Sequence, residues 1–252
     1  MKKRIIIILI ALLATAGVIA SCWFLFEYAP EKKAGEVYED LKVDLGVEPV
    51  LDVPEVDEDD INPIDFKALT EKYPDAYAWI RIPGTNVDYP IVQREGDNSY
   101  YLSHTIDGRK RIEGAIFTEE YNNKDFEDPN TLIYGHNMKN GSMFRTLHRY
   151  KDRKFFEENP YIYIYQEGKV LKYRIFAAYT YDDRHIMMSF DFEDKNVFQI
   201  YLNSILTNKE ISSNIDLMVP VTVEDKIITL STCTSNQNQR YLVQAVLLTE
   251  GE

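Results

Sequence analysis

Short strand-like runs, separated by turn-forming residues, recur between residues 77 and 248 of this 252-residue chain. Some runs alternate apolar and polar residues, and others are continuous apolar stretches rich in β-branched and aromatic residues. Turns such as Pro83-Gly84-Thr85-Asn86 separate neighbouring runs. The predicted strands are 77–82, 87–92, 114–117, 131–134, 161–165, 169–179, 217–221, 227–232 and 241–248. Many short strands of this kind predict a mainly β fold, either a closed barrel or a sandwich.

Helical spacing interrupts this series of strands. In the stretch Phe192–Leu206 the apolar residues recur every three or four positions, which indicates a helix with one buried face. The other predicted helical segments are Ala34–Leu45, a helix starting at Asn62-Pro63, a short turn at Asn98–His104, Ser142–Tyr150 and Asp152–Glu158. His148 lies in one of them, between Arg145 and Arg149, and is predicted to be a surface residue.

The N-terminus has the pattern of a membrane anchor. Met1–Arg4 is basic, and Ile5–Phe26 is apolar, uncharged and long enough to span a bilayer. The basic flank predicts a cytoplasmic N-terminus and an extracellular remainder. Cleavage as a signal peptide near Ala20-Ser21-Cys22 is the alternative, but the apolar run continues past that point.

The chain therefore divides into four predicted segments. They are a basic cytoplasmic tail (1–4), a transmembrane anchor (5–26), an extracellular stalk (27–61) and a globular domain (62–252). The stalk is expected to be solvated because it is rich in charge and poor in aromatic residues. The net charge of −13 argues against nucleic acid as a partner, since a phosphate backbone requires a basic face.

Cys233 is the first candidate for chemistry. It directly follows the predicted strand 227–232, and the only other cysteine, Cys22, lies in the apolar N-terminal segment. A disulfide between them is not expected, so Cys233 is predicted to be a free thiol. A lone cysteine can also be a structural core residue.

A nucleophilic thiol needs a partner that forms or stabilises its thiolate. Of the four histidines, His136 has the most suggestive position, because it follows the predicted strand 131–134 directly, after Gly135. Gly135 would allow a close backbone approach at that point. His104 and His185 are predicted to lie in polar loops.

Arg240 follows Cys233 after six intervening residues. The loop between them lacks glycine and Arg240 precedes a strand, so a phosphatase-type phosphate cradle is a poor fit. Arginine only donates hydrogen bonds, and it can therefore stabilise the oxyanion formed when a thiolate attacks a carbonyl. The backbone N–H of Thr234 is a candidate second donor. Cysteine, histidine and arginine together predict acyl transfer at a peptide bond, and no metal-binding motif is present, so no metal or other cofactor is expected.

These motifs together resemble those of the sortases, which are membrane-anchored cysteine transpeptidases of Gram-positive bacteria. The resemblance rests on Leu230-Ser231-Thr232-Cys233 followed by Arg240, with Tyr134-Gly135-His136-Asn137 upstream. The serine in the first motif, together with Tyr100–His104 ahead of Gly114–Phe117, is similar to class B. The resemblance implies a closed eight-stranded β-barrel with N-terminal helices and a helix inserted between the sixth and seventh strands, and it makes 62–252 the catalytic domain.

The resemblance also implies a mechanism and partners. Cys233 would attack the threonine carbonyl of a sorting motif, either Asn-Pro-x-Thr-Asn or Ser/Asn-Pro-x-Thr-Gly, in secreted proteins. His136 would protonate the leaving amine, Arg240 and the Thr234 N–H would hold the oxyanion, and an amine of the peptidoglycan precursor would resolve the thioester. The residues implied to line the peptide groove are Asn98, Leu102 and Ser231, with Thr234 beside them. The loop Thr234–Gln239 is shorter than in better-known class B members, which affects the expected motif more than the chemistry.

Two other functions remain open from the sequence. A secreted cysteine hydrolase would use the same residues and differ only in resolving the thioester with water. A surface-binding module with an inert, buried thiol is the second alternative. Alkylation of Cys233 in the native protein distinguishes the two, because a thiol that does not react would favour the module.

Overall fold

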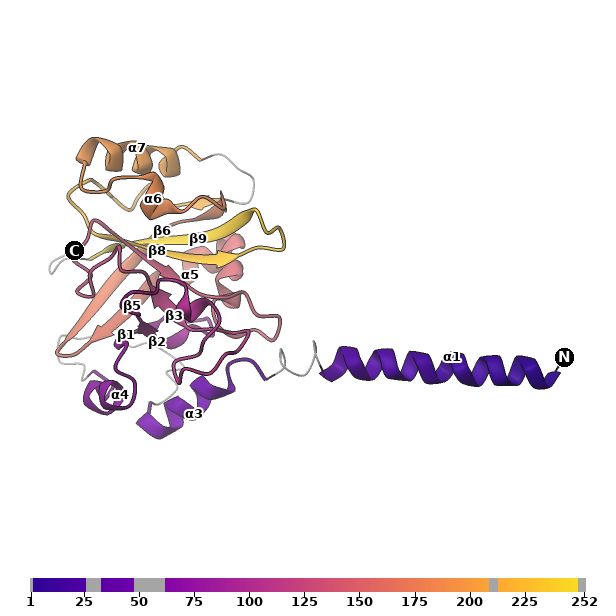
Figure 1. Ribbon diagram of the computed structural model, residues 1–252. Coiled ribbons are helices and arrows are strands. Elements are labelled where there is room, and N and C mark those ends of the chain that lie inside the picture. Colours follow the sequence, from indigo (N-terminus) through magenta and orange to yellow (C-terminus); the bar gives the residue numbers. More distant parts are fainter. Residues whose placement is uncertain (1, 26–32, 48–61, 209–212, 249–252) are drawn as a thin grey trace.

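The computed structural model describes residues 2–25, 33–47, 62–208 and 213–248 (Figure 1). Its helical elements are α1 (Lys2–Trp23), α3 (Glu36–Leu45), α4 (Phe66–Lys72), η2 (Tyr100–Leu102), η3 (Arg145–Lys151), α5 (Arg153–Glu158), α6 (Ile186–Ser189) and α7 (Lys195–Leu206). Its strands are β1 (Ala76–Arg81), β2 (Asp88–Val92), β3 (Ile116–Thr118), β4 (Asn130–Tyr134), β5 (Tyr161–Gln166), β6 (Lys169–Asp182), β7 (Asn214–Ile215), β8 (Ile227–Cys233) and β9 (Gln239–Leu247).

The strands close into a barrel in the order β5-β1-β2-β3-β4-β8-β9-β6, and β6 pairs with β5 to complete the circle. The β2–β3 and β4–β8 pairs are parallel, and the other barrel pairs are antiparallel. The two-residue strand β7 adds to β6 beside the barrel. The predicted mainly β fold is thus confirmed as a closed eight-stranded barrel, with α6 and α7 inserted between β6 and β7.

Two apolar cores lie on opposite faces of the barrel wall. Because side chains alternate along a strand, β8 and β9 contribute to both. Leu230 and Val243 belong to the core inside the barrel, whereas Ile227, Leu242 and Val246 belong to an outer core. The outer core also contains Phe198, Tyr201, Leu202 and Ile205 of α7, and Figure 1 shows this helix covering one side of the barrel. The insertion therefore builds a second layer over the outer face of β8 and β9.

A polar network anchors this second layer. The Gln244 amide is fully buried and donates to the Tyr201 hydroxyl (2.6 Å) and to Thr229 Oγ1 (2.9 Å), while its oxygen accepts from the Tyr179 hydroxyl at 3.2 Å. All of these contacts join α7, β6, β8 and β9. Since a buried amide without partners is costly, the network holds the insertion in one position.

Most of the predicted helices and strands are present, but one predicted strand is absent and one predicted helix begins at a different residue. Stretch 217–221 is not a strand: its Leu217 and Met218 are exposed, and Met218 N–H donates to the Asp216 carboxylate within a turn. The helix predicted from Asn62-Pro63 begins instead at Phe66, where Asp65 caps it by accepting from Ala68 N–H at 2.9 Å. Local side-chain hydrogen bonds decided both outcomes.

Helix α3, within the predicted stalk, packs against the barrel. Tyr38 and Leu41 are buried in the inner core cluster, and the Tyr38 hydroxyl donates to the Gly114 carbonyl at 2.6 Å. Residues 34–47 are therefore part of the folded body. The acidic stretch 51–60 lies outside the described residues. Farther upstream, α1 is long and apolar enough to cross a membrane, judged by length and composition.

Candidate active site

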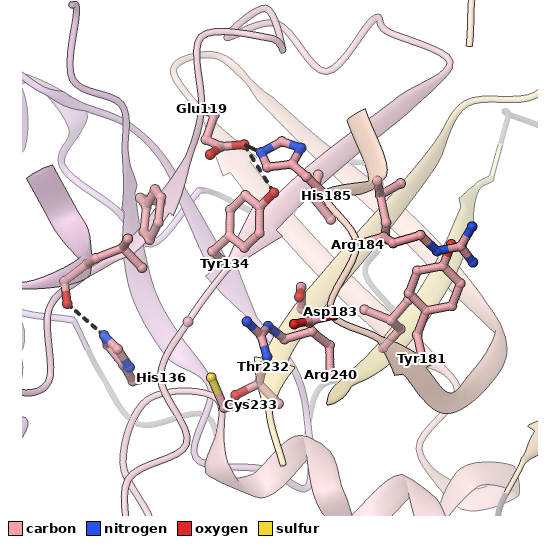
Figure 2. A pocket seen from close by; sticks show the side chains of 17 residues that line it. Glu119, Tyr134, His136, Tyr181, Asp183, Arg184, His185, Thr232, Cys233 and Arg240 are labelled. Atoms are coloured by element: carbon pink, nitrogen blue, oxygen red, sulfur yellow. Dashed lines mark hydrogen bonds and ion pairs between the residues drawn. The ribbon is translucent and has the colours of Figure 1, made fainter. Parts of the chain in front are cut away.

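A cavity of about 240 Å³ opens on the outer face of the barrel, between the ends of β4, β8 and β9 and the segment that follows β6. Figure 2 shows Cys233, Arg240 and His136 among the side chains that line it. Its wall is completed by residues of η2, of the neighbouring strands and the residues that follow them, and of the segment that leads from β6 into α6. These residues are Leu102, Phe117, Glu119, Leu132, Tyr134, Gly135, Tyr181, Asp183, Arg184, His185, Ile186, Ser231, Thr232 and Leu242.

Cys233 and Arg240 lie directly opposite each other across the β8–β9 pair. The next pair along, Thr234 and Gln239, is joined by a backbone hydrogen bond, so Cys233 and Arg240 form the intervening non-hydrogen-bonded pair, in which side chains are closest. The Arg240 guanidinium donates to the Gln237 carbonyl (2.9 Å) and the Gln239 carbonyl (3.1 Å). The β8–β9 hairpin thus brings the Cys233 thiol and the Arg240 guanidinium to the same face of the sheet, although six residues separate them in the sequence.

His136 lies at the end of β4, the parallel neighbour of β8. Its Nε2 is 2.7 Å from the Leu102 carbonyl, as the dashed line in Figure 2 shows. A carbonyl only accepts, so Nε2 carries the proton, and Nδ1 is the free acceptor of the neutral ring. In the view of Figure 2 the Cys233 sulfur lies between His136 and Arg240.

Position 135, directly before His136, has no room for a side chain, and only glycine fits there. A Cβ atom there would lie 2.5 Å from Ile116 Cδ1 and 2.6 Å from Phe144 Cγ. The Gly135 N–H donates to the Ser231 carbonyl at 3.1 Å, which continues the β4–β8 ladder. Glycine is therefore required at position 135 because any Cβ atom would collide with the Ile116 and Phe144 side chains.

Substituting Gly135→Ala is expected to destabilise the protein by about 1–3 kcal/mol, since overpacking a filled core displaces its neighbours. The displacement should also move His136 and lower the rate of peptide cleavage. Urea unfolding and a cleavage assay measure the two effects. An alanine variant with the parent's midpoint and rate would contradict the packing argument.

Of the other four predicted site residues, two line the cavity and two do not. Leu102 and Ser231 line the cavity, whereas Asn98 and Thr234 do not, and the Asn98 side chain accepts from Glu120 N–H at 2.9 Å. The Thr234 N–H donates to the Gln239 carbonyl over a long 3.4 Å. Among the residues that the structure describes, no cluster of histidine, cysteine and carboxylate side chains could hold a metal ion.

His148 is not the surface residue that the sequence predicted. It is half-buried, its ring packs on Tyr241 with centroids 5.0 Å apart, and its Nε2 is 3.1 Å from the Cys233 carbonyl. Burial lowers the pKa of His148, an effect that the bond to the Cys233 carbonyl opposes and that Lys151 and Arg145 reinforce. The prediction failed because the fold places His148 of η3 against the β8–β9 hairpin, where the Cys233 carbonyl and the Tyr241 ring cover it.

Sequence reasoning missed the polar end of the cavity. Glu119 accepts from the Tyr134 hydroxyl at 3.0 Å and pairs with His185 Nε2 at 2.8 Å (Figure 2). Burial and the nearby Glu119 carboxylate raise the pKa of Tyr134. His185 lies next to α6, far from Glu119 in sequence, and no local pattern links the two. Only the folded insertion brings them together.

Comparison with known proteins gives consistent matches. The sortase domain model matches residues 80–248. Sortase B of Listeria monocytogenes is 35% identical over 190 residues, which cover 74% of this chain and 75% of the relative. Sortase B of Staphylococcus aureus is 29% identical over 186 residues, covering 73% and 74% respectively.

Solved structures agree. The structure of sortase B from B. anthracis in complex with AAEK1 superimposes with a TM-score of 0.67 at 30% identity, over 85% of this chain and 98% of that chain.

Proposed function

Because the chain belongs to the sortase family of cysteine transpeptidases, within class B, we propose that Cys233 is its nucleophile and that His136 and Arg240 complete the catalytic site. The observation that carries this proposal is the register of β8 and β9, which sets Cys233 opposite Arg240 in a cavity that His136 also lines. The substrate is a secreted protein with a sorting motif of the type Asn-Pro-x-Thr-Asn or Ser/Asn-Pro-x-Thr-Gly.

The reaction proceeds in two acyl transfers. The Cys233 thiolate adds to the threonine carbonyl, and the negative charge on the carbonyl oxygen is stabilised by Arg240 and the Thr234 N–H. The C–N bond then breaks, protonated His136 gives its proton to the leaving amine, and a thioester remains. A peptidoglycan-precursor amine attacks this thioester, loses a proton to His136 and releases the thiolate.

The residues that line the cavity are suited to a peptide substrate. Its apolar side chains, among them Leu102, Ile186 and Leu242, offer contact to an extended chain, and its polar groups lie at Glu119 and around Cys233. We propose that Leu102 and Ser231 contact the motif beside the scissile bond. With α1 as a membrane anchor, the catalytic body would face the cell wall.

The proposal is tested by incubating the full-length protein in detergent with the peptides Asn-Pro-Gln-Thr-Asn, Asn-Pro-Gln-Thr-Gly and Ser-Pro-Gln-Thr-Gly, each extended at both ends. Triglycine or diaminopimelate serves as the amine. Mass spectrometry should detect a ligated product that ends in threonine joined to the amine. Hydrolysed product alone, at all amine concentrations, would identify a hydrolase instead, and intact peptides would refute the proposal.

A further inference from the structure

Strand β8 extends beyond the end of its neighbour β4. The β4–β8 ladder ends at Tyr134 opposite Ser231, and one further bond joins Gly135 N–H to the Ser231 carbonyl. The Cys233 carbonyl lies past this point. Since Cys233 and Arg240 are a non-hydrogen-bonded pair, this carbonyl also faces away from β9. Neither neighbouring strand can satisfy it.

Two side chains take the place of the missing strand. Asn137 Nδ2 donates to the Cys233 carbonyl at 2.8 Å, and His148 Nε2 donates to it at 3.1 Å. Both come from the chain that follows β4, where an isolated bridge between Asn137 and Met143 closes a loop before η3. We refer to Asn137 and His148 as the carbonyl clamp.

Each member of the carbonyl clamp is itself held. Arg145 donates to Asn137 Oδ1 at 3.0 Å, which leaves the amide nitrogen directed at the Cys233 carbonyl. The His148 ring rests on Tyr241, which lies next to Arg240 in β9. A neutral imidazole with its proton on Nε2 donates to a carbonyl, and so does the charged ring. The clamp therefore keeps its donors at any pH at which the protein is folded.

The carbonyl clamp acts on the same peptide unit that supplies the proposed oxyanion donor. A peptide is planar and trans, so its C=O and N–H point in opposite directions. Two donors that fix the Cys233 carbonyl also fix the direction of the Thr234 N–H. This N–H makes only a long bond, 3.4 Å, to the Gln239 carbonyl, which is longer than the usual N–H···O range of about 2.7–3.2 Å. It can exchange that weak partner for a developing oxyanion.

From this geometry we propose that Asn137 and His148 are positioning residues that orient the Cys233–Thr234 peptide so that its N–H stabilises the oxyanion. The inference rests on the proposed function, in which Cys233 forms an acyl enzyme. Neither side chain touches the substrate. Hydrogen bonds to the carbonyl also polarise the peptide and strengthen its N–H as a donor.

Four single variants of the full-length protein, and the double variant Asn137→Ala/His148→Phe, test this role. Asn137→Ala and His148→Phe each remove one donor, and phenylalanine keeps a ring on Tyr241. His148→Gln retains a side-chain N–H. Asn140→Ala is the matched control, because Asn140 is in the same loop and also donates to a backbone carbonyl, that of Ala34 at 2.6 Å, but on the α3 side.

Two rates are measured for each variant. The first is the rate of acylation by the best of the three motif peptides, followed by rapid quench and intact-mass spectrometry. The second is the rate of Cys233 alkylation by iodoacetamide, a reaction that forms no oxyanion. Removing a direct oxyanion donor costs about 100- to 1,000-fold, so a lost positioning contact is expected to lower acylation about tenfold, and both together about 100-fold. Alkylation should stay within about twofold of the parent rate, and His148→Gln and Asn140→Ala should acylate like the parent.

The outcomes separate this inference from the proposed function. If the parent acylates normally and the clamp variants do too, the inference is overturned while the proposed function stands. If the variants lose acylation and alkylation equally, the clamp supports the thiol itself, and the inference is likewise wrong. If the parent forms no acyl enzyme with any peptide, the proposed function fails and the inference fails with it.

Discussion

Replacing Cys233 by alanine is expected to abolish thioester formation and to reduce peptide cleavage by about 1,000-fold or more, since a covalent mechanism cannot proceed without its nucleophile. Cys233 is partly exposed at the cavity, and the other cysteine, Cys22, lies in α1. The loss should therefore come without a loss of folding, because no buried apolar side chain is removed. Intact-mass spectrometry with motif peptides and a thermal melt measure the two quantities.

Cys22→Ala is the matched control for this experiment, since it removes the other thiol and should leave the acyl adduct in place. Cys233→Ser distinguishes the thiol from its shape, and it should be as inactive as the alanine variant because a hydroxyl is far less readily ionised. An acyl adduct on the Cys233→Ala protein would refute Cys233 as the nucleophile.

Replacing Arg240 is expected to have the second-largest effect. Loss of an oxyanion donor should lower kcat by about 100- to 1,000-fold in Arg240→Ala, with a smaller change in KM. Arg240→Lys should recover little of this loss, because Nη1 alone donates to the Gln237 and Gln239 carbonyls, and an ammonium has no second nitrogen to offer to the oxyanion. Steady-state cleavage of the best motif peptide measures both parameters.

Arg153→Ala is a suitable control, because Arg153 is exposed on α5 and pairs with Glu157. It removes the same charge and should leave both parameters near the parent values. An Arg240→Ala enzyme with raised KM and unchanged kcat would show that Arg240 binds the peptide rather than stabilising the oxyanion.

The sequence by itself was enough to place the candidate catalytic residues at strand ends. The apolar runs around Thr131 and Ile228 predicted β4 and β8, and each run led directly to a candidate catalytic residue, His136 or Cys233. These features are local: a run of β-branched residues, a glycine or an uncharged apolar segment acts over a few positions. The same is true of α7, whose helical spacing is plain in the sequence.

Only the tertiary structure decided which distant residues meet. The register of β8 and β9 set Cys233 opposite Arg240, and the docking of η3 carried His148 beneath the Cys233 carbonyl. The insertion after β6 brought His185 to Glu119. Such contacts depend on barrel closure and on the burial of two cores at once, which no local pattern encodes. For that reason the strands and the candidate nucleophile could be proposed from the sequence, whereas the cavity wall and the carbonyl clamp could not.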